Sequence, residues 1–271
     1  MQVQRHICIV AFHEFSVSVR HRTHFPVVFS VLFPDGKIIV FYWFALNMTI
    51  SADTTLQKTL VKICGVTIPE QALACVEAGA DWIGLNGWPK SKRFISVEQM
   101  QEITQALPDG VTAVGVFVNA SADTLHRAVE DGGVACVQLH GDETPEFARA
   151  LRVPWFRAFR PGPEFRVESI SDYGQAHFLF DAYQPGHYGG TGQTLDWELA
   201  QQATQHGKLL LAGGLTSDNV AAAIRRVRPF GVDTASGVES APGIKDVAKV
   251  RAFVQAVREE DSHLAPLPPL R

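Results

Sequence analysis

The chain has 271 residues, of which 46% are hydrophobic and 19% are charged, as in an ordinary globular protein with room for one large domain or two small ones. Its formal net charge of −4 argues against a nucleic-acid binder, which usually carries a strong basic patch. Four cysteines (Cys8, Cys64, Cys75 and Cys136) are widely spaced and form no C-x-x-C pair. This favours reduced thiols in a cytoplasmic protein over a disulfide framework or a zinc site.

The first 57 residues differ in pattern from the rest. Apolar patches at 25–29 and 38–44 are split by a Pro-Asp-Gly turn signal at 34–36, and both are far shorter than the ~20 apolar residues of a membrane helix. The segment also fits a secretory signal poorly. We expect residues 1–57 to be a poorly ordered extension or a mis-assigned start, with Met48 as the true first residue. A small β-hairpin around the turn is the alternative.

From residue 58 onward, apolar strand-like runs alternate with helical patterns. The expected strands are 61–65, 81–86, 113–118, 135–139, 155–159, 177–180, 209–212 and 231–234. The expected helices are 69–79, 96–107, 121–131 with Ser121 as N-cap, one from 144 with Pro145 in its first turn, 163–173, one capped by Ser217 or Asp218, and 245–258.

Eight strand–helix units in about 200 residues match the length and order of a (β/α)₈ TIM barrel. Doubly wound sheets also alternate strands and helices, but usually use five or six strands. The sequence therefore predicts a single α/β barrel domain at 58–258, followed by a disordered tail at 259–271.

Catalytic groups of such barrels lie where strands end and loops begin. Cys64 ends the first expected strand, and Asp181 follows the sixth. A thiol and a carboxylate at two separated strand ends suggest a general base and a general acid that share one pocket. Cys75 falls inside the first helix and is most simply a small core residue.

Two glycine-containing turns follow the last two strands, at Gly213-Gly214 and Ser236-Gly237. Loops at these places in many barrels present backbone N–H groups to a phosphate. We therefore expect a phosphate site, with ordinary strand-to-helix turns as the alternative. The Gly-rich stretch at 186–192 has no P-loop lysine and is better interpreted as a mobile loop over the pocket.

Two further side chains have a functional and a structural interpretation. Arg93 follows the second strand and could grip a carboxylate with two parallel hydrogen bonds, or belong to a solvated basic loop. His140 ends the fourth strand and could line the pocket or serve as a structural hydrogen-bonding group.

Seven short motifs in order resemble phosphoribosylanthranilate isomerase of tryptophan biosynthesis. They are KICG at 62–65, PKSKR at 89–93, QLHGD at 138–142, FDA at 180–182, YGGTG at 188–192, LAGGL at 211–215 and SGVE at 236–239. The resemblance covers about residues 61–258 without large gaps, and residues 1–57 have no counterpart in it.

The resemblance implies an Amadori rearrangement of N-(5-phosphoribosyl)anthranilate to 1-(2-carboxyphenylamino)-1-deoxyribulose 5-phosphate. Asp181 would be the general acid, Cys64 the general base, and Arg93 the group that holds the anthranilate carboxylate. His140 would contact the substrate, and the turns at Gly213-Gly214 and Ser236-Gly237 would hold its phosphate. No metal or cofactor is implied. The expected partner is a phosphorylated small molecule, with no nucleic acid or membrane, and the protein would be a monomer or a homodimer.

Some positions depart from the family pattern, notably the Asn-Gly-Trp run at 86–88, Lys92 where proline is common, and the Thr-Ala pair at 234–235. They make the carboxylate contact less secure than the acid–base pair. Two rival functions are the related isomerase of histidine biosynthesis, which uses an aspartate at the place of Cys64, and a non-catalytic phosphate-binding or assembly barrel. The first uses a second phosphate site, and this chain has no paired glycine turns after its third and fourth strands to form one. The second has no need for both an acid and a base.

Overall fold

The computed structural model describes residues 58–182 and 196–264, together with the backbone of four strands earlier in the chain. The chain divides into two units, Met1–Asp53 and Thr54–Arg271. In the first unit, β1 (Ile7–Phe12), β2 (Phe15–Arg20), β3 (Val27–Leu32) and β4 (Ile38–Trp43) form an antiparallel sheet in sequence order. Strands β3 and β4 pair on either side of residues 33–37, as the hairpin interpretation describes. The start at Met48 stays a prediction.

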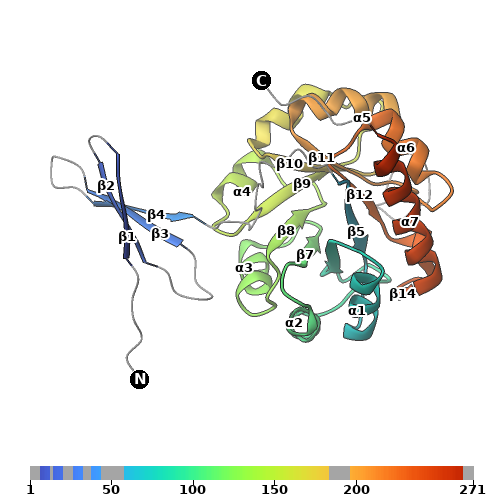
Figure 1. Cartoon of the computed structure of the whole chain (residues 1–271), viewed down its shortest axis with the longest axis horizontal. Coiled ribbons are helices and arrows are strands. Elements are labelled where there is room, and N and C mark those ends of the chain that lie inside the picture. Colours follow the sequence, from blue (N-terminus) through green and yellow to red (C-terminus); the bar gives the residue numbers. More distant parts are fainter. Residues whose placement is uncertain are drawn as a thin grey trace. The chain divides into compact units, whose positions relative to one another are not determined.

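The second unit is a closed barrel of eight parallel strands wrapped by helices (Figure 1). Its strands are β5 (Leu60–Cys64), β6 (Trp82–Asn86), β7 (Thr112–Phe117), β8 (Cys136–Leu139), β9 (Trp155–Phe159), β10 (His177–Phe180), β11 (Lys208–Leu211) and β12 (Gly231–Thr234). Strand β12 pairs with β5 and closes the barrel. The predicted TIM barrel is confirmed, and each expected strand is found within one residue at either end.

The α-helices of this unit are α1 (Pro69–Glu77), α2 (Val97–Ala106), α3 (Ala122–Glu130), α4 (Pro145–Ala150), α5 (Trp197–Ala203), α6 (Val220–Val227) and α7 (Val247–His263). The 3₁₀ helices are η1 (Val167–Tyr173), η2 (Thr204–His206) and η3 (Ser236–Val238), and a short hairpin joins β13 (Glu239–Ala241) to β14 (Ile244–Lys245). Ser121 accepts the N-cap hydrogen bond of α3, as predicted, and Pro145 opens α4.

Helix assignments differ from the sequence prediction at four places. The segment expected as a helix at 163–173 forms only η1. Helix α5, capped by Asp196, was not predicted. Neither Ser217 nor Asp218 caps α6; Asn219 holds that position, and its Oδ1 accepts from the Thr216 N–H instead.

The last helix, α7, is longer than predicted and runs into the expected tail. Its final turn is fixed because Glu260 is buried and paired with Arg225, and Asp261 accepts hydrogen bonds from the N–H and hydroxyl of Thr59. The barrel unit therefore extends beyond residue 258, and the predicted boundary at 259 falls inside a packed helix.

Side-chain alternation along the strands divides the core into two layers. On β5, Val61 and Ile63 point outward and pack under the helices, which places Lys62 and Cys64 on the inner face. The barrel interior is filled mainly by Trp82, Val114, Cys136, Phe156, Ala158, Leu179, Leu210 and Ala212. The register between β5 and β12 sets Lys62 opposite Asp233, so two charges lie inside an otherwise apolar barrel.

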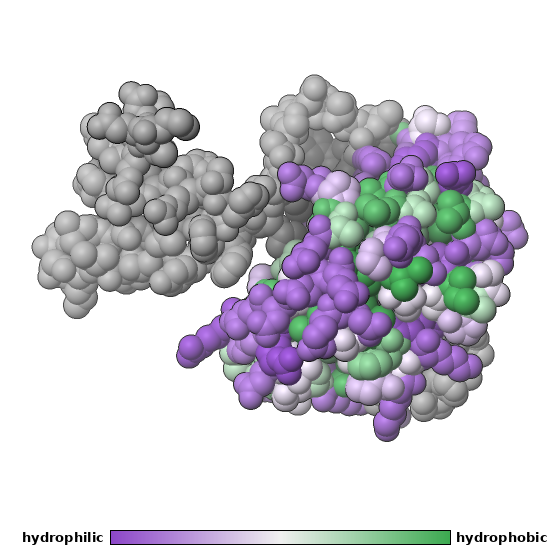
Figure 2. All heavy atoms as spheres, turned by 90° about the horizontal axis from the view of Figure 1, so that it is seen from below, coloured by the Kyte–Doolittle hydropathy of each residue, from purple (hydrophilic) through white to green (hydrophobic). Residues whose placement is uncertain are grey.

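The surface of the barrel unit in Figure 2 is mostly hydrophilic, with smaller apolar areas set among the polar side chains. Four large apolar side chains of the described part are exposed: Ile68, Leu73, Phe94 and Ile244. Within residues 58–182 and 196–264, none of the helices has both the length and the apolar character that a membrane span requires.

Candidate active site

A pocket of about 450 Å³ opens among the strand-to-helix loops of the barrel. Seven of the eight predicted site residues line it: Cys64, Arg93, His140, Asp181, Gly213, Gly214 and Ser236. Gly237 lies behind the pocket wall, where an added Cβ would come within 2.1 Å of the Leu215 carbonyl oxygen. The residues that the sequence placed at separate strand ends therefore meet in one cavity.

Cys64 occupies the last position of β5 and is partly exposed. The neighbouring strand gives it space, because a Cβ on Gly84 would lie 2.8 Å from the Cys64 Sγ. Gly65 turns the chain away from the pocket with a φ of +75°. Burial raises the pKa of the Cys64 thiol, and the ammonium groups of Lys62 and Lys245 oppose this rise.

Lys62 is the charged group that the sequence interpretation left without a role. Its side chain is 0% exposed, and its Nζ lies 2.7 Å from the Asp233 Oδ1. Burial alone would lower the pKa of Lys62, but Asp233 and Cys64 outweigh it and the pKa is raised. The signal was present in the sequence, because a lysine alternates with apolar residues at the inward positions of a buried strand.

Asp181 is buried directly after β10, with one carboxylate oxygen hydrogen-bonded and the other near His140. Oδ1 accepts a hydrogen bond of 2.8 Å from the Ala182 N–H, and Oδ2 lies 3.4 Å from the His140 Nε2. His140 is itself fixed, since the Gln138 amide nitrogen lies 2.7 Å from its Nδ1. If this amide donates to Nδ1, the ring proton of the neutral His140 sits on Nε2 and faces Asp181.

Two buried polar atoms, one on His140 and one on Gln138, form no hydrogen bond within the described part of the chain. Among the described residues, His140 Nε2 and Gln138 Oε1 are buried without a hydrogen bond. Buried polar groups are costly unless they are satisfied, so this corner of the pocket suits a ligand that carries hydroxyl groups. Gln138 was not among the predicted site residues, although it lies in the same sequence motif as His140.

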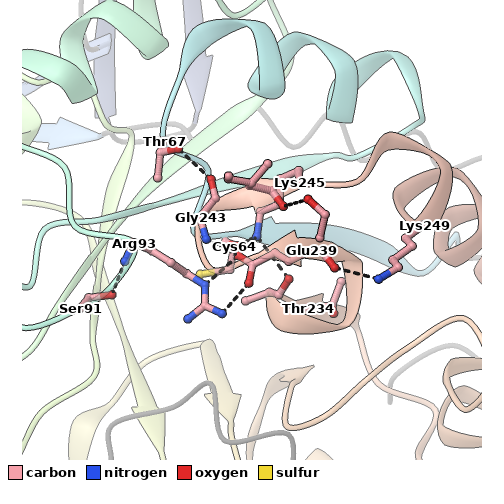
Figure 3. A network of polar contacts seen from close by, with 12 residues as sticks. Cys64, Thr67, Ser91, Arg93, Thr234, Glu239, Gly243, Lys245 and Lys249 are labelled. Atoms are coloured by element: carbon pink, nitrogen blue, oxygen red, sulfur yellow. Dashed lines mark hydrogen bonds and ion pairs between the residues drawn. The ribbon is translucent and has the colours of Figure 1, made fainter.

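Arg93 is anchored before any ligand binds. Its Nε and Nη2 donate to the two oxygens of Glu239 over 2.8 and 2.6 Å, and Glu239 also accepts from the Lys245 Nζ over 2.8 Å (Figure 3). Burial pushes the pKa of Glu239 up, but the hydrogen bonds and charges of Arg93 and Lys245 outweigh it and lower the pKa. A guanidinium has five N–H donors, so Arg93 keeps three beyond the two that Glu239 accepts.

Lys245 connects the Glu239 carboxylate to the backbone at Cys64. Its Nζ donates to the backbone oxygen of Cys64 over 2.6 Å and to that of Ala235 over 3.2 Å. The ends of β5 and β12 are therefore connected through one buried ammonium. Neither Glu239 nor Lys245 was predicted, because their partners are set by tertiary contacts and not by their own strand positions.

The predicted phosphate-binding turns lie on the wall formed by the loops after β11 and β12. Gly213 and Gly214 have φ values of +86° and +66°, and a Cβ on Gly213 would lie 2.7 Å from the Ala182 backbone nitrogen. Thr234 ties the two loops together, since its hydroxyl donates to the Leu215 carbonyl oxygen over 2.7 Å. The backbone at Gly213 and Gly214 therefore has a left-handed conformation, which a residue with a side chain adopts only with strain.

The unusual loop after β6 also contributes to the pocket through Asn86 and Trp88. Gly87 is required there, because an added Cβ would lie 2.2 Å from the Phe117 ring. The Asn86 Oδ1 accepts from the Trp88 N–H over 2.9 Å and fixes the turn. The glycine-rich stretch at 186–192, predicted to cover the pocket, lies outside the described residues.

Across residues 58–182 and 196–264, His, Cys, Asp and Glu side chains form no group of three or more that could hold a metal ion. The thiol and the carboxyl group of this pocket can exchange protons with a bound ligand, with charged groups positioned around them.

Comparisons with known proteins agree on one family. A sequence model described as N-(5'phosphoribosyl)anthranilate (PRA) isomerase matches residues 61–256. The N-(5'-phosphoribosyl)anthranilate isomerase of Trichlorobacter lovleyi is 48% identical over 200 residues, which cover 73% of this chain and 98% of the relative.

Solved structures of the same enzyme are also similar. One, a phosphoribosyl anthranilate isomerase in complex with reduced 1-(o-carboxyphenylamino)-1-deoxyribulose 5-phosphate, is 37% identical with a TM-score of 0.67. Another, with the same identity and TM-score, shows monomers generated from the dimeric enzyme of Thermotoga maritima. Each covers 74% of this chain and 99% of the solved chain. This chain therefore belongs to the N-(5'-phosphoribosyl)anthranilate isomerase family.

Proposed function

We propose that this pocket carries out the isomerisation of the family with Asp181 as general acid and Cys64 as general base. The reaction converts N-(5'-phosphoribosyl)anthranilate to 1-(2-carboxyphenylamino)-1-deoxyribulose 5-phosphate in tryptophan biosynthesis. The observation that carries the assignment of roles is the meeting of both side chains in one pocket with Arg93 and the two glycine turns.

The first step opens the ribose ring. Asp181 donates its proton to the furanose ring oxygen, the C1′–O bond breaks, and the anthranilate nitrogen supplies electrons to form an iminium. The Oδ1 of the carboxylate that remains accepts from the Ala182 N–H, which stabilises its new charge.

The second step moves the proton from C2′. The Cys64 thiolate takes this proton, and the electrons of the C–H bond neutralise the iminium to give an enolamine. Tautomerisation of the enolamine moves its hydroxyl proton to C1′ and yields the ketone. Both groups return to their starting states when the Cys64 thiol releases the proton it took and Asp181 regains a proton.

The rest of the pocket positions the substrate. Arg93, held by Glu239, directs its remaining donors toward the anthranilate carboxylate, and the turns at Gly213-Gly214 and Ser236-Gly237 receive the phosphate. The unpartnered atoms of His140 and Gln138 suit the ribose hydroxyls. No step requires a metal or an organic cofactor.

The test is isomerase turnover of the full chain, followed by loss of substrate fluorescence, with the variants Cys64→Ala and Asp181→Asn. We expect each variant to lose about 10²-fold or more in kcat, the effect of a missing acid or base. Cys75→Ala, at a buried thiol of α1, and Asp218→Asn, at an exposed carboxylate, serve as matched controls. Full activity in Cys64→Ala or Asp181→Asn would overturn that role.

The cellular setting follows from the same proposal. The enzyme acts on a phosphorylated small molecule in the cytoplasm, as a monomer or as a homodimer like that of Thermotoga maritima. Light scattering of the full chain separates the two states.

A further inference from the structure

The inner face of β5 carries a charge directly below the thiol. Lys62 and Cys64 are two residues apart on one strand, so both side chains point into the barrel. Lys62 lies at the level of the apolar interior cluster that includes Trp82 and Cys136. An apolar side chain would fill this space without any cost of removing charge from water, so the lysine calls for a reason beyond packing.

Lys62 has two partners inside the barrel. Its Nζ pairs with the Asp233 Oδ1 over 2.7 Å, and its positive charge also acts on the Cys64 side chain, which shares the inner face of β5. Asp233 comes from β12, whose register with β5 places it opposite Lys62. The ammonium therefore interacts with the Asp233 carboxylate and with a sulfur atom that is charged in only one of its protonation states.

Two other cations face Cys64, and both have a carboxylate partner of their own. Lys245 and Arg93 interact electrostatically with Cys64, but each forms an ion pair with Glu239 (Figure 3). Lys245 reaches the backbone oxygen of Cys64 through its Nζ. Lys62 differs from both in sharing the inner face of β5 with Cys64, and the register sets Asp233 opposite it as the competing charge.

We propose that Lys62 is a positioning residue that favours the thiolate of Cys64 for proton abstraction against the opposing effect of burial, and that Asp233 limits this effect by competing for the same ammonium. The inference rests on the proposed role of Cys64 as general base. When Cys64 takes the C2′ proton and becomes neutral, the ammonium keeps its proton and its bond to Asp233. No proton passes through Lys62.

The proposal predicts shifts of opposite sign from two neighbouring substitutions. Lys62→Met removes the positive charge, so the thiol of Cys64 should titrate at higher pH. Asp233→Asn removes the competing carboxylate, so the thiol should titrate at lower pH. A nearby charge shifts the pKa of a group by about one unit or more. The rate of alkylation at pH 7 should therefore fall about tenfold in Lys62→Met and rise about tenfold in Asp233→Asn.

The readout is the rate at which iodoacetamide modifies Cys64 between pH 6 and 10, measured on the full chain by mass spectrometry of the peptide that contains it. The buried Cys75 and Cys136 are distinguished in the same digest. Lys58→Met is the matched control, because Lys58 precedes the same strand and pairs with Asp81 at an exposed position. It should leave the Cys64 titration unchanged.

A folding defect is separated from the proposed effect by the double variant Lys62→Met with Asp233→Asn, which leaves neither partner buried alone. Its Cys64 should titrate above that of the wild type. Shifts in the same direction for Lys62→Met and Asp233→Asn, or no shift in Lys62→Met, would overturn the proposal. Because alkylation needs no turnover, this outcome is distinct from a finding that Cys64 is not the catalytic base.

Discussion

Arg93, which is proposed to hold the anthranilate carboxylate, is positioned by a buried carboxylate. Glu239 accepts from Nε and Nη2, and a Cβ on Gly65 would lie 2.3 Å from the Arg93 Cδ, so the side chain runs close along the backbone at Gly65. A guanidinium fixed along one edge can still present its other donors to a carboxylate. Lysine cannot do both.

We expect Arg93→Lys to raise the KM for the anthranilate substrate about tenfold or more, with a smaller change in kcat. The reason is that a lysine makes neither the paired bonds to Glu239 nor a directed bond to the substrate carboxylate. Steady-state kinetics give both constants. Arg127→Lys, at an exposed ion pair, is the control. A fall in kcat at constant KM would contradict the assignment.

The raised pKa of Cys64 predicts how activity depends on pH. A base acts only when deprotonated, and burial keeps the thiol protonated to a higher pH than usual. We therefore expect kcat/KM to rise with pH through the titration of Cys64. In Cys64→Asp this limb should move to the acid side, because a carboxyl group loses its proton at much lower pH. An unchanged limb in that variant would assign it to another group.

Membership of the pocket could be predicted from the sequence where it depends on strand position alone. Cys64 and Asp181 were found because each ends a strand, and the pocket lining includes both. Asp233, Glu239 and Lys245 were not found, because their partners depend on the register between the first and last barrel strands and on the hairpin after β12.

At the scale of elements, the turn after β11 combines conformational strain with a steric limit. Gly213 has a positive φ, and the Ala182 backbone lies 2.7 Å from the position of its missing Cβ. Gly174 also has a positive φ, of +64°, but open space surrounds it. Substitutions at Gly213 and Gly174 can therefore be compared to separate the free-energy cost of the positive φ from that of contact with the neighbouring loop.

We expect Gly213→Ala to lower the free energy of unfolding by about 2–3 kcal/mol and to raise the KM, since the phosphate turn must shift away from Ala182. Gly174→Ala should cost about 1–2 kcal/mol, the penalty of the left-handed angle alone, with kinetics unchanged. Denaturant unfolding and steady-state assays measure the two effects. Equal losses in the two variants would show that contact with Ala182 plays no part.

Elements were predictable where periodicity and caps are local. The strands were found within a residue because they are apolar runs between turn signals. Helix α7 was placed too short because its last turn is fixed by Glu260 and Asp261, whose partners Arg225 and Thr59 lie far away in sequence. Helix α5 was missed because the pattern before it is a long glycine-rich stretch.

At the scale of the whole molecule, the pocket and the family match lie within the unit Thr54–Arg271. We expect a chain that starts at Met48 to keep kcat/KM within about twofold of the full chain, because all of the pocket residues remain. The two purified proteins are assayed side by side under the same conditions, with the full chain as the reference. A large loss of kcat/KM would show that residues 1–47 contribute to the activity.

The start at Met48 has its own measurement. Mass spectrometry of the amino terminus of the protein made in its natural host should detect no peptide from residues 1–47. Such a peptide would contradict the predicted start and leave the antiparallel sheet β1–β4 as a part of the natural protein.

The pairing of β12 with β5 has a consequence for the order in which the protein is made. The sulfur of Cys64 leaves the ribosome early, whereas Asp233 is synthesised 169 residues after it (233 − 64). Until the last strand closes the barrel, Lys62 has no opposing carboxylate and the thiol has no pocket wall. The Cys64 thiol of the nascent chain is therefore not yet enclosed, and the proposed acid–base site is complete only after the final strand has formed.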